Sequence, residues 1–276
     1  MTLRQHLQKR TDVWMGAVSR NRWRERVASV EALLDGWTNH TWTKDPVTFA
    51  VELHAPDNPS YREEMSRMRA WRCRARELGV PFFALTVVRE PVAHAVSSFY
   101  HYVRIEKRRR AYHRGPAEDS EAGLVGSAIA HPQCVFLARG EKAYEHDDGP
   151  GSPRGNLTRE DCAALATEML VDFDWIGTTA TIDEETVPIL DYLLGDGRRK
   201  GRKRKPPAAA VRENTRVGSL LSANTLTEAT RQHLQNITKW DRSLLYDMAR
   251  KQFSFARDWK PRIEAAAEAR KTKQHR

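Results

Sequence analysis

The sequence predicts an α/β fold in which a parallel sheet is flanked by helices. Three short apolar segments, 47–53, 82–88 and 173–177, alternate with longer charged segments of helical period. Strands that alternate with helices at this spacing are typical of βαβ units and therefore of a parallel sheet. Residues 82–88 are continuously apolar, as expected of a central strand that is covered on both faces.

The N-terminal part of the chain is predicted to alternate helix and strand. Ser60, with Glu63 three residues later, forms a capping-box pattern that opens a helix. Pro91 suits the first turn of another, because its missing N–H would be unpaired there in any case. The expected elements are a helix over 2–34, a strand over 47–53, a helix over 60–78, a strand over 82–88 and a helix over 91–104.

The C-terminal part is predicted to be mostly helical. Thr158 or Asn156 should cap a helix that starts near these residues, because both side chains accept hydrogen bonds from helical N–H groups. The expected elements are a helical stretch near 124–137, a helix over 156–170, a strand over 173–177, a helix over 181–194 and a helical region over 225–253. No internal repeat is evident.

The chain is basic, and its charge is unevenly spread. Lys and Arg number 46 against 36 Asp and Glu, a net charge of +10 that favours anionic partners such as phosphate-bearing cofactors, acidic glycans, nucleic acid or a membrane surface. The run 198–205 would suit a nucleic-acid patch, but it lies in a Gly- and Pro-containing connector at 195–210. We expect one domain over 1–255 that includes this connector, followed by a charged, solvated or frayed tail at 256–276.

The cysteines and the hydropathy restrict the other possibilities. Cys73, Cys134 and Cys162 lie far apart without CxxC spacing, which argues against a structural zinc site and leaves one disulfide possible. No apolar run reaches the length of a membrane span, and the N-terminus lacks the core of a signal peptide. Three Asn-x-Thr triplets slightly favour a secretory compartment; they begin at Asn39, Asn156 and Asn236.

Polar residues follow two of the predicted strands, where ligands gather in an open parallel sheet. Arg89 and Glu90 come directly after the strand 82–88, and Pro91 then opens a helix. The N–H groups of that helix end and the forked guanidinium of Arg89 would together cradle an oxyanion or a phosphate. In the alternative interpretation, Arg89 merely pairs with Glu90 or with a neighbouring helix.

The segment around Arg89 is more specific than a general anion site. Val88-Arg89-Glu90-Pro91, with Ser97 eight residues after the arginine, resembles the 3′-phosphate-binding motif of sulfotransferases. The chain is most similar to the membrane-associated carbohydrate sulfotransferase superfamily. The resemblance implies a P-loop-NTPase-like fold, no metal, 3′-phosphoadenosine 5′-phosphosulfate (PAPS) as sulfuryl donor and a hydroxyl or amine as acceptor. Arg89 and Ser97 would hold the 3′-phosphate of PAPS.

Other segments agree with this family in order and spacing. His131-Pro-Gln133 is similar to the family's Asn-x-Gln segment, although His131 replaces the asparagine. Asp174 to Gly177 resembles its late strand, and Trp240-Asp241 lies in a segment that resembles its closing pattern. These matches are weak individually, and the series covers nearly the whole chain.

One part of the family pattern is missing. The family begins with a strand and a Lys-containing loop that holds the 5′-phosphosulfate, whereas residues 1–7 here resemble only the end of that loop and its helix. We therefore expect a chain that is truncated at its N-terminus and lacks the first strand and the phosphosulfate loop, with Thr2 as the one remaining cofactor-binding residue of the loop. A Golgi membrane anchor, which the family implies, would also lie upstream.

His54 is the first candidate for the base that activates the acceptor hydroxyl. It ends the predicted strand 47–53 at the expected edge of the sheet, and imidazole titrates near neutral pH. Glu52 points to the same face, so it remains a second candidate. In the alternative interpretation, His54 only caps the strand. His94 and His101 could also line the cleft, or they are half-buried surface residues.

Three hypotheses follow. The first is a PAPS-dependent sulfotransferase of the Golgi lumen or membrane that acts on a carbohydrate and, without its phosphosulfate loop, shows weak or no activity. The second is an inactive remnant that keeps the fold and binds anions or glycans. The third is a basic nucleic-acid-binding protein, which would need a continuous basic face; the scatter of charge into loops and tail argues against it.

Overall fold

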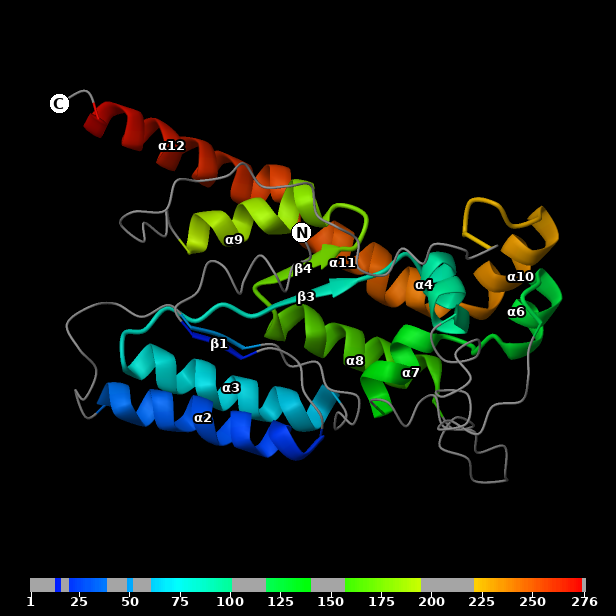
Figure 1. The fold of residues 1–276 in the computed structure, drawn as a ribbon, viewed down its shortest axis with the longest axis horizontal. Helices are drawn as coiled ribbons and strands as arrows, with labels where there is room; N and C mark the ends of the chain where they lie inside the picture. The colour runs from blue at the N-terminus through cyan, green and yellow to red at the C-terminus, as the bar shows by residue number, and fades with distance from the viewer. Residues whose placement is uncertain are drawn as a thin grey trace. The chain divides into compact units, whose positions relative to one another are not determined.

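The computed structural model describes residues 13–15, 20–38, 49–51, 61–100, 118–139, 157–194 and 221–274. This part of the chain is mostly helical and contains two small parallel sheets of two strands each (Figure 1). The chain divides into two compact units. The first unit consists of residues 1–55, 180–215 and 250–276, and the second unit of residues 56–179 and 216–249.

The second unit is built on the parallel pair β3 (Leu85–Val88) and β4 (Trp175–Thr178). Leu85 pairs with Trp175 and Val88 with Thr178, and every residue of β4 is buried. The Asp174 carboxylate, just before β4, accepts the backbone N–H of Ala84 at 2.7 Å. This bond fixes the register where the two strands begin. The predictions of strands at 82–88 and 173–177 are confirmed, with β3 shorter than expected.

The other regular elements of this unit, in the described ranges, are helical. They are α3 (Tyr61–Glu77), α4 (Pro91–Ser98), α6 (Glu121–Ser127), α7 (Pro132–Arg139), α8 (Arg159–Asp172), α10 (Glu228–Ile237) and the π-helical turn η4 (Asp241–Tyr246). Helix α3 packs on α7 and α8, whereas α4 packs on α10, α7 and η4. The core under α4 joins its residues Val92 and Ala95, and the following Phe99, to Leu124 of α6 and Leu234 of α10.

Several ends of these helices follow from local sequence. Gly79 adopts φ +67° directly after α3, a left-handed conformation that glycine adopts without the steric cost of a Cβ. Thr158 caps α8 by accepting the N–H of Asp161, whose carboxylate accepts the N–H of Thr158 in return. Thr158 is therefore the cap of this helix, and the predicted helix boundaries at these two points are confirmed.

The first unit contains the parallel pair β1 (Val13–Met15) and β2 (Phe49–Val51), with Val13 opposite Phe49 and Met15 opposite Val51. Its helical elements are α2 (Arg20–Thr38), η3 (Ile182–Thr186), α9 (Val187–Leu193), η5 (Phe255–Trp259) and α12 (Lys260–Gln274). Helix α12 packs on η5 and α9, and Tyr192 meets Trp259 edge to face with ring centroids 6.2 Å apart. Helix α11 (Asp247–Gln252) crosses the boundary between the units.

The expectations for the N-terminal part are wrong at one point. Residues 13–15 form β1, so the helix expected over 2–34 is not continuous, and a strand does precede the strand at 49–51. The β-branched Val13 and the aromatic Trp14 have strand propensity, and the hydrogen bonds to β2 use their backbone groups. Within the described residues, the favourable helical composition of the region is realised in α2, which begins at Arg20.

Two expected helices are interrupted, and the expected frayed end is helical. The stretch near 124–137 divides into α6 and α7, and the region 225–253 divides into α10, η4 and α11. Residues 260–274 form α12, in which Ala-rich sequence and charge pairs such as Lys271–Glu268 (2.7 Å) support the helix. None of the helices in the described ranges is long and apolar enough to span a bilayer.

Two arginines of α3 hold the end of α8 and the start of β4. Arg69 donates from Nε and Nη2 to the two carboxylate oxygens of Asp172, both at 2.7 Å. Arg72 donates to the Asp172 carbonyl and to the Asp174 carboxylate, also at 2.7 Å each. The Asp172 side chain is only 4% exposed, so its charge depends on this bidentate partner.

Replacing Arg69 by Ala should lower the free energy of unfolding by about 1–3 kcal/mol, because a buried carboxylate loses its partner while the arginine itself was half exposed. Urea denaturation followed by circular dichroism measures this. Arg74→Ala is the matched control: Arg74 lies on the same helix and pairs with the exposed Glu77 at 4.0 Å, so we expect less than about 0.5 kcal/mol. Equal losses in the two variants would contradict the assignment.

Candidate functional site

Strand β3 passes into helix α4 through Arg89, Glu90 and Pro91, as the sequence predicts. Glu90 is the N-cap: its Oε2 accepts the N–H of Ala93 at 2.7 Å, and Pro91 occupies the first helical position. This corrects one expectation, since part of the N–H potential of the helix end is already used by Glu90. An anion at this corner would therefore depend more on side chains than on the helix end.

Gln133, in the first turn of α7, holds the backbone of Arg89. The N–H of Arg89 donates to Gln133 Oε1 at 3.0 Å, and Gln133 Nε2 donates to the carbonyl of Arg89 at 2.8 Å. Gln133 is buried, so both bonds are shielded from competing water. The Gln133 amide thus pairs with the backbone of Arg89 as a neighbouring strand would. It thereby fixes the position of the Arg89 backbone at the carboxyl end of β3.

Asp241, the first residue of η4, caps α7. Its two carboxylate oxygens accept the N–H groups of Gln133 and Cys134, both at 2.9 Å, and the residue is fully buried. Burial raises the pKa of Asp241 to about 7, against the opposing effect of the two backbone hydrogen bonds. Asp241 and Gln133 together link η4, α7 and the end of β3.

The turn before α7 is held in a conformation that is uncommon for a residue with a Cβ. His131 adopts φ +49°, its N–H donates to the carbonyl of Ile237 at 2.9 Å, and its ring stacks on Trp240 at 3.8 Å between centroids. Burial, together with the charge of Lys239, lowers the pKa of His131 to about 4, so the stacked ring is neutral at pH 7. The neutral ring is thus a packing element of this turn.

A disulfide joins α7 to α8. Cys134 and Cys162 are both fully buried, with their Cα atoms 5.7 Å apart, while Cys73 is an exposed free thiol. The pairing that the sequence leaves open is therefore Cys134–Cys162. Because Cys134 also receives the Asp241 cap, the first turn of α7 is fixed from two sides.

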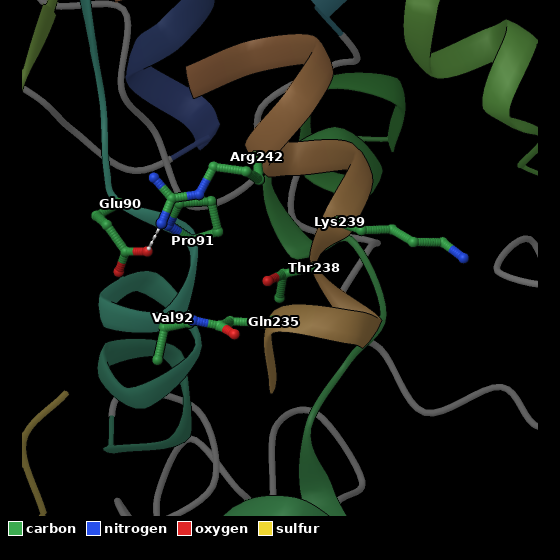
Figure 2. Close-up of a pocket in the computed structure, with 7 residues that line it drawn as sticks. All are labelled: Glu90, Pro91, Val92, Gln235, Thr238, Lys239 and Arg242. Carbon is green, nitrogen blue, oxygen red and sulfur yellow. Dashed lines mark hydrogen bonds and ion pairs between the residues drawn. The ribbon is translucent and has the colours of Figure 1, made fainter. Parts of the chain in front are cut away.

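A cavity of about 260 Å³ lies between the start of α4 and the junction of α10 with η4 (Figure 2). Arg242 crosses its edge and donates from Nη2 to Glu90 Oε1 at 2.6 Å, while its guanidinium lies 5.1 Å from the centre of the Tyr246 ring. In Figure 2 the Gln235 amide reaches toward Val92, and the Lys239 side chain points away from the Glu90–Arg242 pair. The lining residues are Glu90, Pro91, Val92, Gln235, Thr238, Lys239 and Arg242.

The structure brings together some of the residues singled out in the sequence and leaves others outside its description. Arg89 stands at the end of β3, and Ser97 lies two turns into α4, partly exposed. His54, Glu52 and Thr2 lie outside the described residues, as does the basic connector 195–210. No cluster of three or more potential metal ligands occurs in the described ranges.

Sequence reasoning missed the residues that organise this corner. The cap by Asp241 and the pairing of Arg242 with Glu90 join positions more than a hundred residues apart. In the sequence, Trp240-Asp241 and Gln133 stand out only as parts of a family pattern. The residues near Asp241 and Gln133 in the sequence do not indicate which hydrogen bonds they make, because their partners are brought close only by the folding of the chain.

Because the pKa of Asp241 is raised, its contribution to the free energy of unfolding should fall as pH rises. A carboxyl whose pKa is higher when folded contributes its full stabilisation below its unfolded value near 3.8 and loses it as pH rises through about 7. Asn cannot titrate and keeps only one acceptor oxygen, so Asp241→Asn should cost about 1–2 kcal/mol at pH 5. The deficit relative to the natural protein should shrink between pH 5 and pH 8.

Urea denaturation at both pH values measures this change. Asp183→Asn, which removes an exposed carboxylate at η3, controls for the loss of one charge. A deficit that grows with pH would show instead that the two N–H bonds outweigh burial and keep the carboxyl ionised.

The chain matches no known protein-family model, no curated protein and no solved structure. Its function must therefore be argued from the junction of β3 with α4 and from the motifs gathered there.

Proposed function

We propose that this protein is a PAPS-dependent sulfotransferase of P-loop-like fold. It would move a sulfuryl group from PAPS to a hydroxyl, or an amine, of a carbohydrate acceptor, with the 3′-phosphate of PAPS at Arg89 and Ser97. The parallel strand pairs and helices are compatible with such a fold. The resemblance to the family itself rests on the sequence motifs described above.

The observation that carries the proposal is the mutual bonding of three motif segments. Arg89, Gln133 and Asp241 belong to three separate segments that resemble the family, and they form one chain of hydrogen bonds: Arg89 to Gln133 and Gln133 to Asp241. Chance resemblances scattered over the sequence have no reason to meet in space. Their meeting at the carboxyl end of parallel strand β3, where α/β sheets bind ligands, supports a shared binding role.

The chemistry needs a donor site, an acceptor site and a base. In-line transfer breaks the bond between sulfur and the bridging phosphate oxygen and forms a bond between sulfur and the acceptor oxygen. The acceptor proton passes to His54, or to Glu52, and adenosine 3′,5′-bisphosphate leaves. Arg89 would neutralise charge on the 3′-phosphate and thereby hold the donor in place.

The disulfide bears on the cellular location. Disulfides form and persist in oxidising compartments, and Cys134, which directly follows Gln133 in α7, forms a disulfide with Cys162 of α8. A Golgi lumen location, as the family resemblance implies, fits this chemistry and the basic charge suits an acidic glycan partner.

The donor site is tested by calorimetry with adenosine 3′,5′-bisphosphate. Arg89→Ala should weaken binding about 10- to 100-fold, because hydrogen bonds to a charged group contribute about 1.5–3 kcal/mol. Adenosine 5′-monophosphate, which lacks the 3′-phosphate, should bind equally to both proteins. Arg74→Ala removes a half-exposed arginine of α3 and should leave both affinities unchanged. Equal affinity of the natural protein and Arg89→Ala for the bisphosphate would refute the site.

The base is tested by turnover with PAPS and a panel of carbohydrate acceptors. Where transfer is measurable, His54→Ala should lower kcat at least about 100-fold with little effect on donor binding, the usual loss on removing a general base. Glu52→Gln is the companion variant for the second candidate, and His233→Ala removes an exposed histidine of α10 as control. Binding of the bisphosphate without transfer to any acceptor would favour the inactive remnant instead.

A further inference from the structure

His94, in the first half of α4, carries a polar atom that the protein itself does not satisfy. Its Nδ1 is buried and has no hydrogen-bond partner among the residues that the structure describes. The residue as a whole is only partly buried, and its other ring nitrogen, Nε2, is not a buried unpaired atom. Buried polar atoms are nearly always paired, and an unpaired one calls for an explanation.

The unpaired atom determines where the ring proton lies. An N–H buried without an acceptor loses a hydrogen bond that water would have provided, so the single proton of a neutral imidazole is better placed on Nε2. Burial, and then the charge of Arg89, lower the pKa of His94 to about 4, so the ring is neutral at pH 7. With its proton on Nε2, His94 is a neutral hydrogen-bond donor that lies within the field of Arg89.

Among the described residues, the elements that pack against α4 bring no second charged group to this role. Helix α10 faces it with Leu234 and Gln235, and α7 approaches through Gln133. On η4, the Asp241 carboxylate caps α7, and Arg242 is paired with Glu90. The immediate electrostatic neighbour of His94 is thus Arg89.

The spacing along α4 puts His94 next to the proposed phosphate ligands. His94 and Ser97 are three residues apart and so lie on the same face of the helix, one above the other. Arg89 lies at the N-terminal end of that helix. A phosphate bound by both Arg89 and Ser97 would therefore lie along the face of α4 that carries His94.

We propose that His94 is a third ligand of the 3′-phosphate and donates a hydrogen bond from Nε2–H as a neutral imidazole. The inference rests on the proposed function, because it concerns the same phosphate. The ligand class is a phosphate monoester, and free inorganic phosphate or sulfate shares that chemistry. A neutral donor adds a directional bond to the charge of Arg89 without taking up a proton.

The test compares two replacements of similar size. His94→Leu keeps bulk but removes the N–H, whereas His94→Gln keeps an N–H donor. Calorimetry at pH 7.5 should show that His94→Leu binds adenosine 3′,5′-bisphosphate about 10- to 100-fold more weakly, the usual loss for a hydrogen bond to a charged group, and that His94→Gln recovers much of this loss. Affinity for adenosine 5′-monophosphate should not change, and His233→Leu, at an exposed position of α10, should bind both ligands normally.

A second measurement uses the unaltered protein, so it does not depend on the folding of a variant. In a ¹⁵N-histidine-labelled sample, the His94 signals should show protonated Nε2 and bare Nδ1. Adenosine 3′,5′-bisphosphate should shift the Nε2–H signal without adding a second ring proton, and adenosine 5′-monophosphate should leave it in place. Inorganic phosphate shifting the same signal at high concentration only would identify the phosphate group as the part that is recognised.

The outcomes separate this inference from the proposed function. Loss of bisphosphate binding in Arg89→Ala but not in His94→Leu, with no shift of the Nε2–H signal, overturns the role of His94 and leaves the donor site intact. Equal losses for both nucleotides in His94→Leu mean that the residue is structural, which also overturns it. If the bisphosphate does not bind the natural protein while inorganic phosphate shifts the Nε2–H signal, the sulfotransferase proposal fails and the anion ligand stands. If neither binds, both fail.

Discussion

The buried carboxylate of Asp241 is the contact on which the junction of β3 with α4 depends. It accepts two N–H groups in the first turn of α7, where a helix otherwise leaves its donors unpaired, and thereby fixes that turn against η4. Gln133 lies in the same turn and bonds both backbone groups of Arg89. The position of Arg89 at the end of β3 thus follows from a carboxylate that lies in sequence more than a hundred residues away.

The charged residues at the junction of β3 with α4 have different electrostatic neighbours. Glu90 accepts the N–H of Ala93 and the guanidinium of Arg242, which keeps its carboxylate engaged at the edge of the cavity. The His94 ring, held neutral by burial, lies within the field of Arg89. In the proposed site, a cation beside a neutral donor would suit a phosphate, because charge supplies attraction and a directional bond supplies orientation.

Ion pairs also hold the strands β3 and β4 and the neighbouring helices together. Arg69 and Arg72 of α3 bind Asp172 and Asp174, and Asp174 in turn accepts the N–H of Ala84 before β3. This network sets the register of β3 against β4, and hence the level at which Arg89 leaves the sheet. The disulfide Cys134–Cys162 adds a covalent link between α7 and α8 in the same unit.

Several local features follow from the amino-acid sequence alone: the end of α3 at Gly79, the cap of α8 at Thr158 and the passage from strand to helix through Arg89, Glu90 and Pro91. Each depends on the conformational preference of a residue or on a hydrogen bond that spans three positions. Other features emerge only from the three-dimensional arrangement: residues 13–15 form a strand, Cys134 pairs with Cys162, and Asp241, Gln133 and Arg242 organise the corner. Those features depend on contacts between residues far apart in the chain. Such contacts stabilise the structure only after folding has brought the partners together.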